Sequence, residues 1–258
     1  MTTETFTTPG QATWTSPLTG TVKTELWGAG AGGGGNAVAS DGGGGGSAGG
    51  YGRLDEYSVA QDAVYTFNVG TQGVGVTSLA GTAGGVTWWR SAADFQVPGG
   101  TAGKVVSGGL PGGVATAIPA TDASFVGTFT AKTAGGNGGA GVNNNNGGGG
   151  GGGGSPGDTG AGGAGGTGGV GIGGTAGAAG TTNGGIGGVG GGGAADGIAP
   201  VSGNGGGGGG SGEGVVKGGD GTSGKVTLTY TIAGAGMPWI APVVAGANSV
   251  IGGGGFTS

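Results

Sequence analysis

Long runs of glycine are the feature that most limits what this chain can fold into. Glycine supplies 85 of the 258 residues, and it clusters in doublets and longer runs. Each glycine inside an α-helix costs about 1 kcal/mol relative to alanine, so helix is excluded as a major element. Collagen has a similar share of glycine, but it needs a strict Gly-X-Y repeat and abundant proline, whereas this chain has 9 prolines.

The side chains on which most enzymes depend are scarce. The sequence has no cysteine and no histidine, and only 7% of its residues are charged. Disulfide frameworks, Cys/His zinc sites and Ser–His–Asp triads are therefore impossible. The 7 basic residues are scattered and the net charge is −5, so we expect no nucleic-acid partner. We predict that the protein is not an enzyme.

Neither a membrane span nor a secretory signal is visible in the sequence. No stretch reaches the roughly 18 consecutive apolar residues that a spanning helix requires. The opening residues, MTTETFTTPG, lack the basic and apolar regions of a signal peptide. We therefore expect no membrane insertion.

Alternation of apolar and polar residues predicts β-strands in residues 1–132 and again in residues 225–232. Phe6 and Trp14 anchor two short β-rich runs that are joined by a turn at Pro9 and Gly10. Further strands of the first region are predicted at 22–27, 51–59, 64–69 and 86–97. In 51–59 the residues expected to share one face are Tyr51, Arg53, Asp55, Tyr57 and Val59.

The strand at 225–232 closes the domain. Its predicted inward-facing residues are Val226, Leu228, Tyr230 and Ile232. An isolated strand is not stable, so this strand must pair with strands of residues 1–132. Residues 133–224 are then an insertion whose two ends are held by one sheet system.

The insertion contains a three-residue repeat. The sequence GGAGGTGGVG at 162–171 continues a row of small residues three positions apart, which comprises Ala161, Ala164, Thr167 and Val170. Three residues per turn is the repeat of the polyproline II helix, which glycine adopts freely. We predict that residues 133–224 form a bundle of polyglycine II helices. The alternative is a flexible linker, but a linker has no need for regularly spaced valine and isoleucine.

Several motifs occur in an order that resembles the glycine-rich domain of bacteriophage tail and tail-fibre proteins. The motifs are FTTPGQATWTSP, VKTELWGAGAGGGG, GGGGGSAGGYGRLDEYSV, VYTFNVG and GGDGTSGKVTLTYT. The resemblance covers residues 4–232 and implies an all-β fold with essentially no α-helix, in which an antiparallel β-sandwich carries a bundle of polyglycine II helices. A similar domain lies in the extracellular part of anaplastic lymphoma kinase, but that version contains cysteines, so the phage resemblance is favoured.

The resemblance implies a structural virion protein of a phage tail, at or near the tail tip, that is assembled in the host cytoplasm. Its partners would be other tail proteins, and it could contribute to host attachment. Two alternatives stay open. One is an adhesin that recognises a cell-surface glycan. The other is an ice-binding protein with a face of short side chains such as Ala161, Ala164 and Thr167.

Two motifs match nucleotide-binding signatures only formally. Gly28-x-Gly30-x-x-Gly33 follows a predicted strand, but no helix follows to hold a pyrophosphate. Residues 219–225 resemble a P-loop, yet Val226 stands where a Ser or Thr should bind magnesium. We expect no cofactor. The carboxylates of the glycine-rich part are isolated, so turns explain them better than a metal site does: Asp158, Asp196 and Asp220.

Two sets of residues are candidates for facing a receptor. Trp88 and Trp89 are adjacent in a predicted strand, so they point to opposite faces and one is expected to contact solvent, a sugar or a partner. The second set is a run of asparagines, expected in a polar loop at the tip of the bundle: Asn143, Asn144, Asn145 and Asn146.

Residues 233–258 form an apolar arm outside the resemblance. Its candidate assembly residues are Met237, Trp239, Ile240, Val243, Val244, Val250 and Ile251. Pro238 and Pro242 interrupt it, which excludes a central strand. We expect the arm to dock on a neighbouring copy or tail protein, with a homotrimer favoured by analogy with phage fibres. The alternative is a tail that folds back on its own sandwich.

Overall fold

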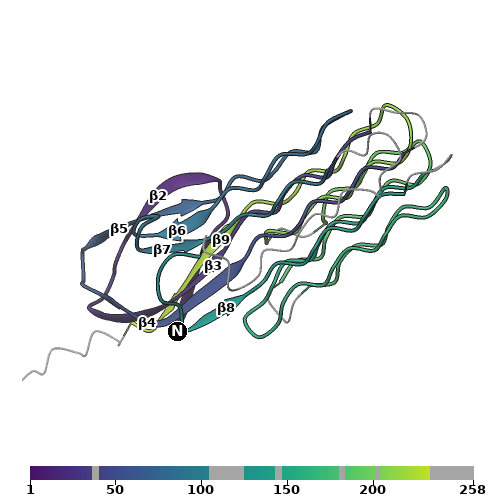
Figure 1. Cartoon of the computed structure of the whole chain (residues 1–258). Coiled ribbons are helices and arrows are strands. Elements are labelled where there is room, and N and C mark those ends of the chain that lie inside the picture. Colours follow the sequence, from purple (N-terminus) through teal and green to yellow (C-terminus); the bar gives the residue numbers. More distant parts are fainter. Residues whose placement is uncertain (37–40, 105–124, 143–146, 180–183, 202–203, 233–258) are drawn as a thin grey trace, which may run out of the picture.

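The fold is all-β in the part of the chain that the computed structural model describes, and this part contains no helix (Figure 1). The described residues are 1–36, 41–104, 125–142, 147–179, 184–201 and 204–232. Their strands are β1 (Thr2–Phe6), β2 (Gly10–Thr15), β3 (Gly20–Trp27), β4 (Tyr51–Val59), β5 (Val64–Val69), β6 (Thr87–Trp89), β7 (Phe95–Val97), β8 (Ala131–Thr133) and β9 (Lys225–Tyr230).

The strands form two antiparallel sheets. One sheet has the order β1-β9-β3-β4-β8 and the other has the order β2-β5-β6-β7. β9 pairs with β1 on one side and with β3 on the other, which confirms that the closing strand joins the N-terminal strands. β8 and β9 lie in the same sheet, so both ends of the glycine-rich insertion are held there.

Aromatic side chains of both sheets meet in the core. Phe6 of the first sheet contacts Phe67 of the second with ring centres 4.6 Å apart, and Trp14 contacts Tyr230 at 5.7 Å. Trp89 is fully buried among them. The two sheets therefore pack face to face in a sandwich-like arrangement, and their large apolar side chains supply most of its stability.

Two details of the predicted strands are wrong. β9 ends at Tyr230, so Ile232 lies beyond the sheet and is 49% exposed. The register of β3 and β4 shifts, because Val22 faces Tyr57 whereas Thr24 faces Leu54. This shift moves the inward face of β4 by one residue, so the residues expected to share a face do not do so.

Every strand from β3 to β9 joins a glycine-rich segment at one end of the sandwich, and these segments run away from the sheets side by side (Figure 1). We call the following stretches the glycine segments: 28–36, 42–50, 70–76, 79–85, 98–104, 134–142, 147–155, 161–169, 172–178, 184–191, 195–200, 205–212 and 216–224. The hydroxyl of Thr87 ties the two sheets together at this end by donating to the carbonyl of Trp27 at 2.7 Å.

Backbone hydrogen bonds join each glycine segment to its neighbours with a repeat of three residues. Segment 28–36 shows the pattern in full. Gly28, Ala31 and Gly34 donate to segment 42–50, Ala29, Gly32 and Gly35 donate to segment 79–85, and Gly30 and Gly33 donate to segment 216–224. Consecutive N–H groups therefore point in three directions around the segment axis, unlike the two directions of a β-strand.

The glycine segments form a lattice in which some are completely surrounded. Segment 147–155 is hydrogen-bonded to six others, namely 42–50, 134–142, 161–169, 172–178, 184–191 and 205–212. Its glycines have no room for a side chain, because a Cβ at Gly151 would lie 1.9 Å from the carbonyl oxygen of Thr175. An unbroken glycine run is thus what an enclosed position requires. At the periphery, in contrast, the third residues of segment 161–169 are exposed: Ala161, Ala164 and Thr167.

Candidate docking site at the far end of the sandwich

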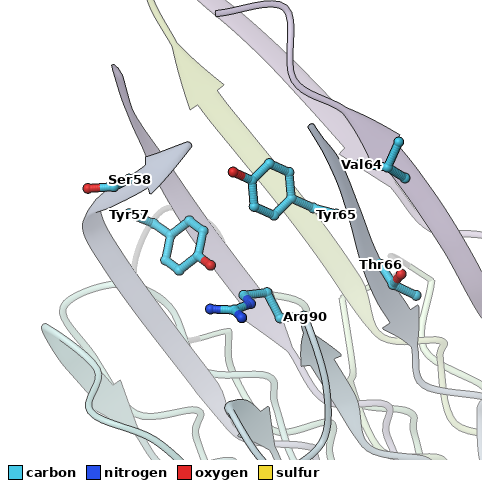
Figure 2. Close-up of a pocket in the computed structure, with 6 residues that line it drawn as sticks. All are labelled: Tyr57, Ser58, Val64, Tyr65, Thr66 and Arg90. Atoms are coloured by element: carbon cyan, nitrogen blue, oxygen red, sulfur yellow. The ribbon is translucent and has the colours of Figure 1, made fainter. Parts of the chain in front are cut away.

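A hollow of about 420 Å³ lies at the end of the sandwich away from the glycine segments (Figure 2). It is positioned by the end of β4, the start of β5 and the residue that follows β6. Its lining residues are Tyr57, Ser58, Val64, Tyr65, Thr66 and Arg90. Figure 2 shows the two tyrosine rings and the Arg90 side chain directed into the same space.

The tyrosines of the hollow are held by the aromatic core. Tyr65 stacks on the buried Trp89 with ring centres 5.7 Å apart and an interplanar angle of 12°. Tyr57 meets Trp89 edge-on at 5.8 Å and meets Tyr65 edge-on at 6.1 Å. The Tyr65 hydroxyl also accepts a hydrogen bond from the N–H of Ala60 at 3.0 Å. Both rings are therefore fixed in place by contacts within the protein.

Arg90 has an unusual backbone conformation. Its φ angle is +65°, in the left-handed region that residues other than glycine rarely adopt. The N–H of Arg90 donates to the carbonyl of Thr66 at 2.8 Å, which fixes this turn against β5. Its Nε lies 3.9 Å from a carboxylate oxygen of Asp94. A hydrogen bond with the Tyr57 hydroxyl, together with the charge of Asp94, raises the pKa of Arg90 and keeps it cationic.

The hollow offers recognition chemistry. Tyrosine and arginine are the residue types that concentrate binding energy at protein interfaces, because they combine a large contact area with hydrogen bonding. The hollow contains one cation and several hydroxyl groups, with no adjacent nucleophile and base.

Within the described residues there is no group of three or more acidic residues that could hold a metal ion. The same residues include no helix long and apolar enough to span a membrane.

A buried polar cluster lies at the opposite end, where the first sheet meets the glycine segments. Glu25 is 5% exposed and accepts a hydrogen bond from the Tyr51 hydroxyl at 2.7 Å. The ammonium group of Lys23 lies 3.1 Å from the same carboxylate. The indole N–H of Trp27 donates to the carbonyl of Pro156 at 3.0 Å, which ties the sheet to the inserted residues. These partners explain why a carboxylate is tolerated here.

The structure separates the two tryptophans that the sequence singled out. Trp89 is fully buried in the core, so the expectation that it could face a receptor is wrong for this residue. Trp88 lies on the other face of β6 and is half-buried, opposite Asn68 and Gln96 on the neighbouring strands. The predicted opposition of the two side chains is therefore confirmed.

The other candidate residues lie outside the described residues. These are Asn143, Asn144, Asn145 and Asn146, and the arm residues Met237, Trp239, Ile240, Val243, Val244, Val250 and Ile251. Sequence reasoning missed the hollow itself. In the sequence its tyrosines are only members of alternating strands, and the signal for Arg90 is its place directly after the Trp-Trp pair, at the end of a strand.

The glycine motif that resembles a dinucleotide fingerprint belongs to the lattice. Every N–H from Gly28 to Gly33 donates to another segment, so these groups are not available to a phosphate. Residues 219–224 likewise run into β9 instead of a helix.

Comparison with protein-family models gives no match to this chain. A search of curated proteins gives no match either.

Proposed function

We propose that this protein is a non-enzymatic structural component of a bacteriophage tail, and that its glycine segments are polyglycine II helices. The hydrogen-bond repeat of three residues along segment 28–36 supports the helix assignment, because a threefold helix directs successive N–H groups to three neighbours. The order of glycine-rich and strand motifs, which resembles phage tail proteins, supports the location in the virion.

The observation that carries the proposal is the two-ended architecture. All strands from β3 to β9 enter the glycine lattice at one end of the sandwich, while the hollow with Tyr57, Tyr65 and Arg90 lies at the other. β9 also runs toward the hollow end, so the chain leaves the sheet there and its last described residue is Ile232. We propose that this end docks on a neighbouring tail protein and that the lattice projects outward as a spacer.

The direct test is the presence of the protein in purified tailed particles, measured by mass spectrometry of separated tails. A protein that is abundant in infected cells but absent from particles would contradict the proposal. The docking end is tested with the double variant Tyr57→Ala/Arg90→Ala, which we expect to fold but to be missing from particles. Leu79→Ala is the matched control, because Leu79 is 67% exposed on a glycine segment at the other end.

The arm is tested by removing residues 236–258. We expect the shortened chain to keep its melting temperature, since β9 is intact, but to lose assembly into particles and any trimer in solution. If the shortened chain still oligomerises and assembles normally, the arm is a passive tail.

An adhesin is the second candidate function, and the half-buried tyrosines and the exposed arginine of the hollow favour it because sugars bind to aromatic rings and hydrogen-bond donors. Binding of labelled protein to bacterial cells, competed by free glycan, would support this function. Loss of binding in Tyr57→Ala/Arg90→Ala would assign it to the hollow.

The exposed row Ala161, Ala164 and Thr167 keeps ice binding as a third candidate. Thermal hysteresis of the purified protein measures it directly. Its absence would remove this function without affecting the structural proposal.

A further inference from the structure

Three glycine segments form one outer face of the lattice. Segment 184–191 lies in the middle, because Gly187 and Gly190 donate to segment 172–178 while its Val189 accepts from Ile198 of segment 195–200. We call the surface of these three segments the aliphatic face.

The aliphatic face is flat because its three segments lie over the same two enclosed segments. Segment 147–155 is bonded to both 172–178 and 184–191, and segment 205–212 is bonded to both 184–191 and 195–200. Each of the three outer segments is hydrogen-bonded to one or both of the enclosed segments beneath them. The outer layer therefore cannot curve without breaking these hydrogen bonds. The face is thus a plane of glycine backbone with side chains at every third residue.

The side chains that stand on this plane are large and apolar. Ile172 is 69% exposed, Ile198 is 53% exposed, and Ile186 and Val189 are each 41% exposed. The other exposed side chains in these segments are the small Thr175, Ala178, Ala195 and Ala199, together with Asp196, which accepts a hydrogen bond from the N–H of Lys217 at 2.7 Å. The sequence has no charged residue between Asp158 and Asp196. Most of this face therefore lacks charged groups that bind water.

These isoleucines and valine have no role that the lattice itself explains. Backbone hydrogen bonds hold the three segments, and alanine or threonine fills the equivalent exposed positions of segment 161–169. Contiguous exposed aliphatic side chains on a soluble protein mark an interaction site.

We propose that the aliphatic face binds the same face of a second copy of this chain. Two glycines separate successive side chains along each segment, so gaps of about 9 Å recur at a rise of about 3.1 Å per residue. An isoleucine of one copy fits into such a gap of the other, and the surface is therefore complementary to itself. A self-complementary face is satisfied by a two-fold pair, which closes at a dimer.

The size of the face sets the strength of the pairing. Three segments of about 20 Å, spaced by about 5 Å, cover about 300 Å² per copy, against about 800 Å² in a standard interface. The dimer is therefore weak in dilute solution and forms where copies are concentrated or anchored side by side. A charged partner is disfavoured because the one charged side chain of these three segments, Asp196, is already engaged by the N–H of Lys217.

The chain has no cysteine, which permits a direct test in the full-length protein. Val189→Cys places a thiol in the central segment of the face, and Leu79→Cys places a more exposed thiol on a segment that does not belong to the face. Under mild oxidation at high protein concentration, we expect Val189→Cys to form disulfide-linked dimers at least tenfold faster than Leu79→Cys. Equal rates in the two variants would overturn the proposal.

A charge-insertion variant tests the same face without cross-linking. In analytical ultracentrifugation, Ile186→Lys/Ile198→Lys is expected to shift the concentration needed for dimerisation upward by at least tenfold, while Val74→Lys/Leu79→Lys leaves it unchanged. All four side chains are exposed, so none of these changes disturbs the core. The same concentration dependence of dimerisation in both variants would contradict the proposal. If the two variants dimerise like the wild type, the proposal that the protein belongs to a phage tail is unaffected, because that proposal is tested by the protein composition of purified particles.

Discussion

The ammonium group of Lys225 lies 3.7 Å from the centre of the Trp27 ring, where the first sheet gives way to the glycine segments. Burial lowers the pKa of Lys225 to about 8, against the opposing effect of the Glu25 carboxylate. A cation over an aromatic face is attracted by the electrons of the ring, and this partly compensates for its lost hydration. The residue that begins β9 is thus a half-buried cation at the junction of the two parts of the fold.

The first prediction concerns the pH dependence of this lysine. Below pH 8 both the folded and the unfolded chain carry the proton, and between about 8 and 10.5 only the unfolded chain does. The unfolded state then binds more protons, so the contribution of Lys225 to stability rises with pH through this window. Urea unfolding at about pH 7, below this window, and at about pH 9.5, inside it, should show a larger gain in stability for the wild type than for Lys225→Met. The exposed Lys104→Met is the control, and identical profiles for all three proteins would refute the prediction.

The second prediction concerns the enclosed glycines. A Cβ at Gly151 would lie 1.9 Å from a carbonyl oxygen, whereas a Cβ at Gly169 meets nothing closer than 3.7 Å. Gly151→Ala must therefore displace a neighbouring segment, at a cost of about 1–3 kcal/mol or more. Gly169→Ala should be neutral or stabilising by up to about 1 kcal/mol, because alanine restricts the unfolded chain. Thermal melts of the two variants measure the difference, and equal melting temperatures would count against the lattice.

The third prediction concerns β9. Ending the chain after Gly224 removes the strand that lies between β1 and β3. Val226 and Leu228 are fully buried, and each such side chain contributes about 1.5–3 kcal/mol, out of a net stability of about 5–15 kcal/mol. We expect no cooperative melting in this truncated chain. A chain that ends after Ile232 should melt normally, and cooperative melting in both would show that β9 is dispensable.

The fourth prediction concerns the buried hydrogen bond between Tyr51 and Glu25. Burial and then this hydrogen bond raise the pKa of Tyr51, so its hydroxyl stays protonated and donates. Tyr51→Phe leaves the carboxylate without this donor, and we expect a loss of about 1–3 kcal/mol in urea unfolding. Tyr65→Phe is the control, since its hydroxyl accepts a bond in an exposed position. A larger loss in the control would exclude our assignment of Tyr51.

The strands with the clearest alternation could be predicted from sequence, and the reason is physical. Val226, Leu228 and Tyr230 alternate with threonines, and one buried face is enough to fix such a strand. Ile232 continues the pattern but has no partner strand beside it, which alternation alone does not reveal. In β4 the register shift opposite Val22 and Thr24 depends on how two strands pair, and that information is not local.

The hollow could not be predicted for the same reason. Tyr57 and Tyr65 lie in strands of different sheets and Arg90 directly follows β6, so only the order of the strands brings the three residues together. The positive φ of Arg90 is also invisible in sequence, because no glycine or asparagine marks the turn. By contrast, uninterrupted glycine runs such as 147–154 and 205–210 can be read directly as positions with no space for a side chain.

The six-neighbour arrangement of segment 147–155 has a mechanical consequence. A β-sheet is stiff within its plane but bends easily across it, because hydrogen bonds run in one direction only. A lattice bonded along three directions has no such compliant axis, so a sideways load on the tip is shared by shear among all the segments whatever its direction. Resistance to bending in every direction, obtained without a large apolar core, is the property that this glycine content gives the molecule.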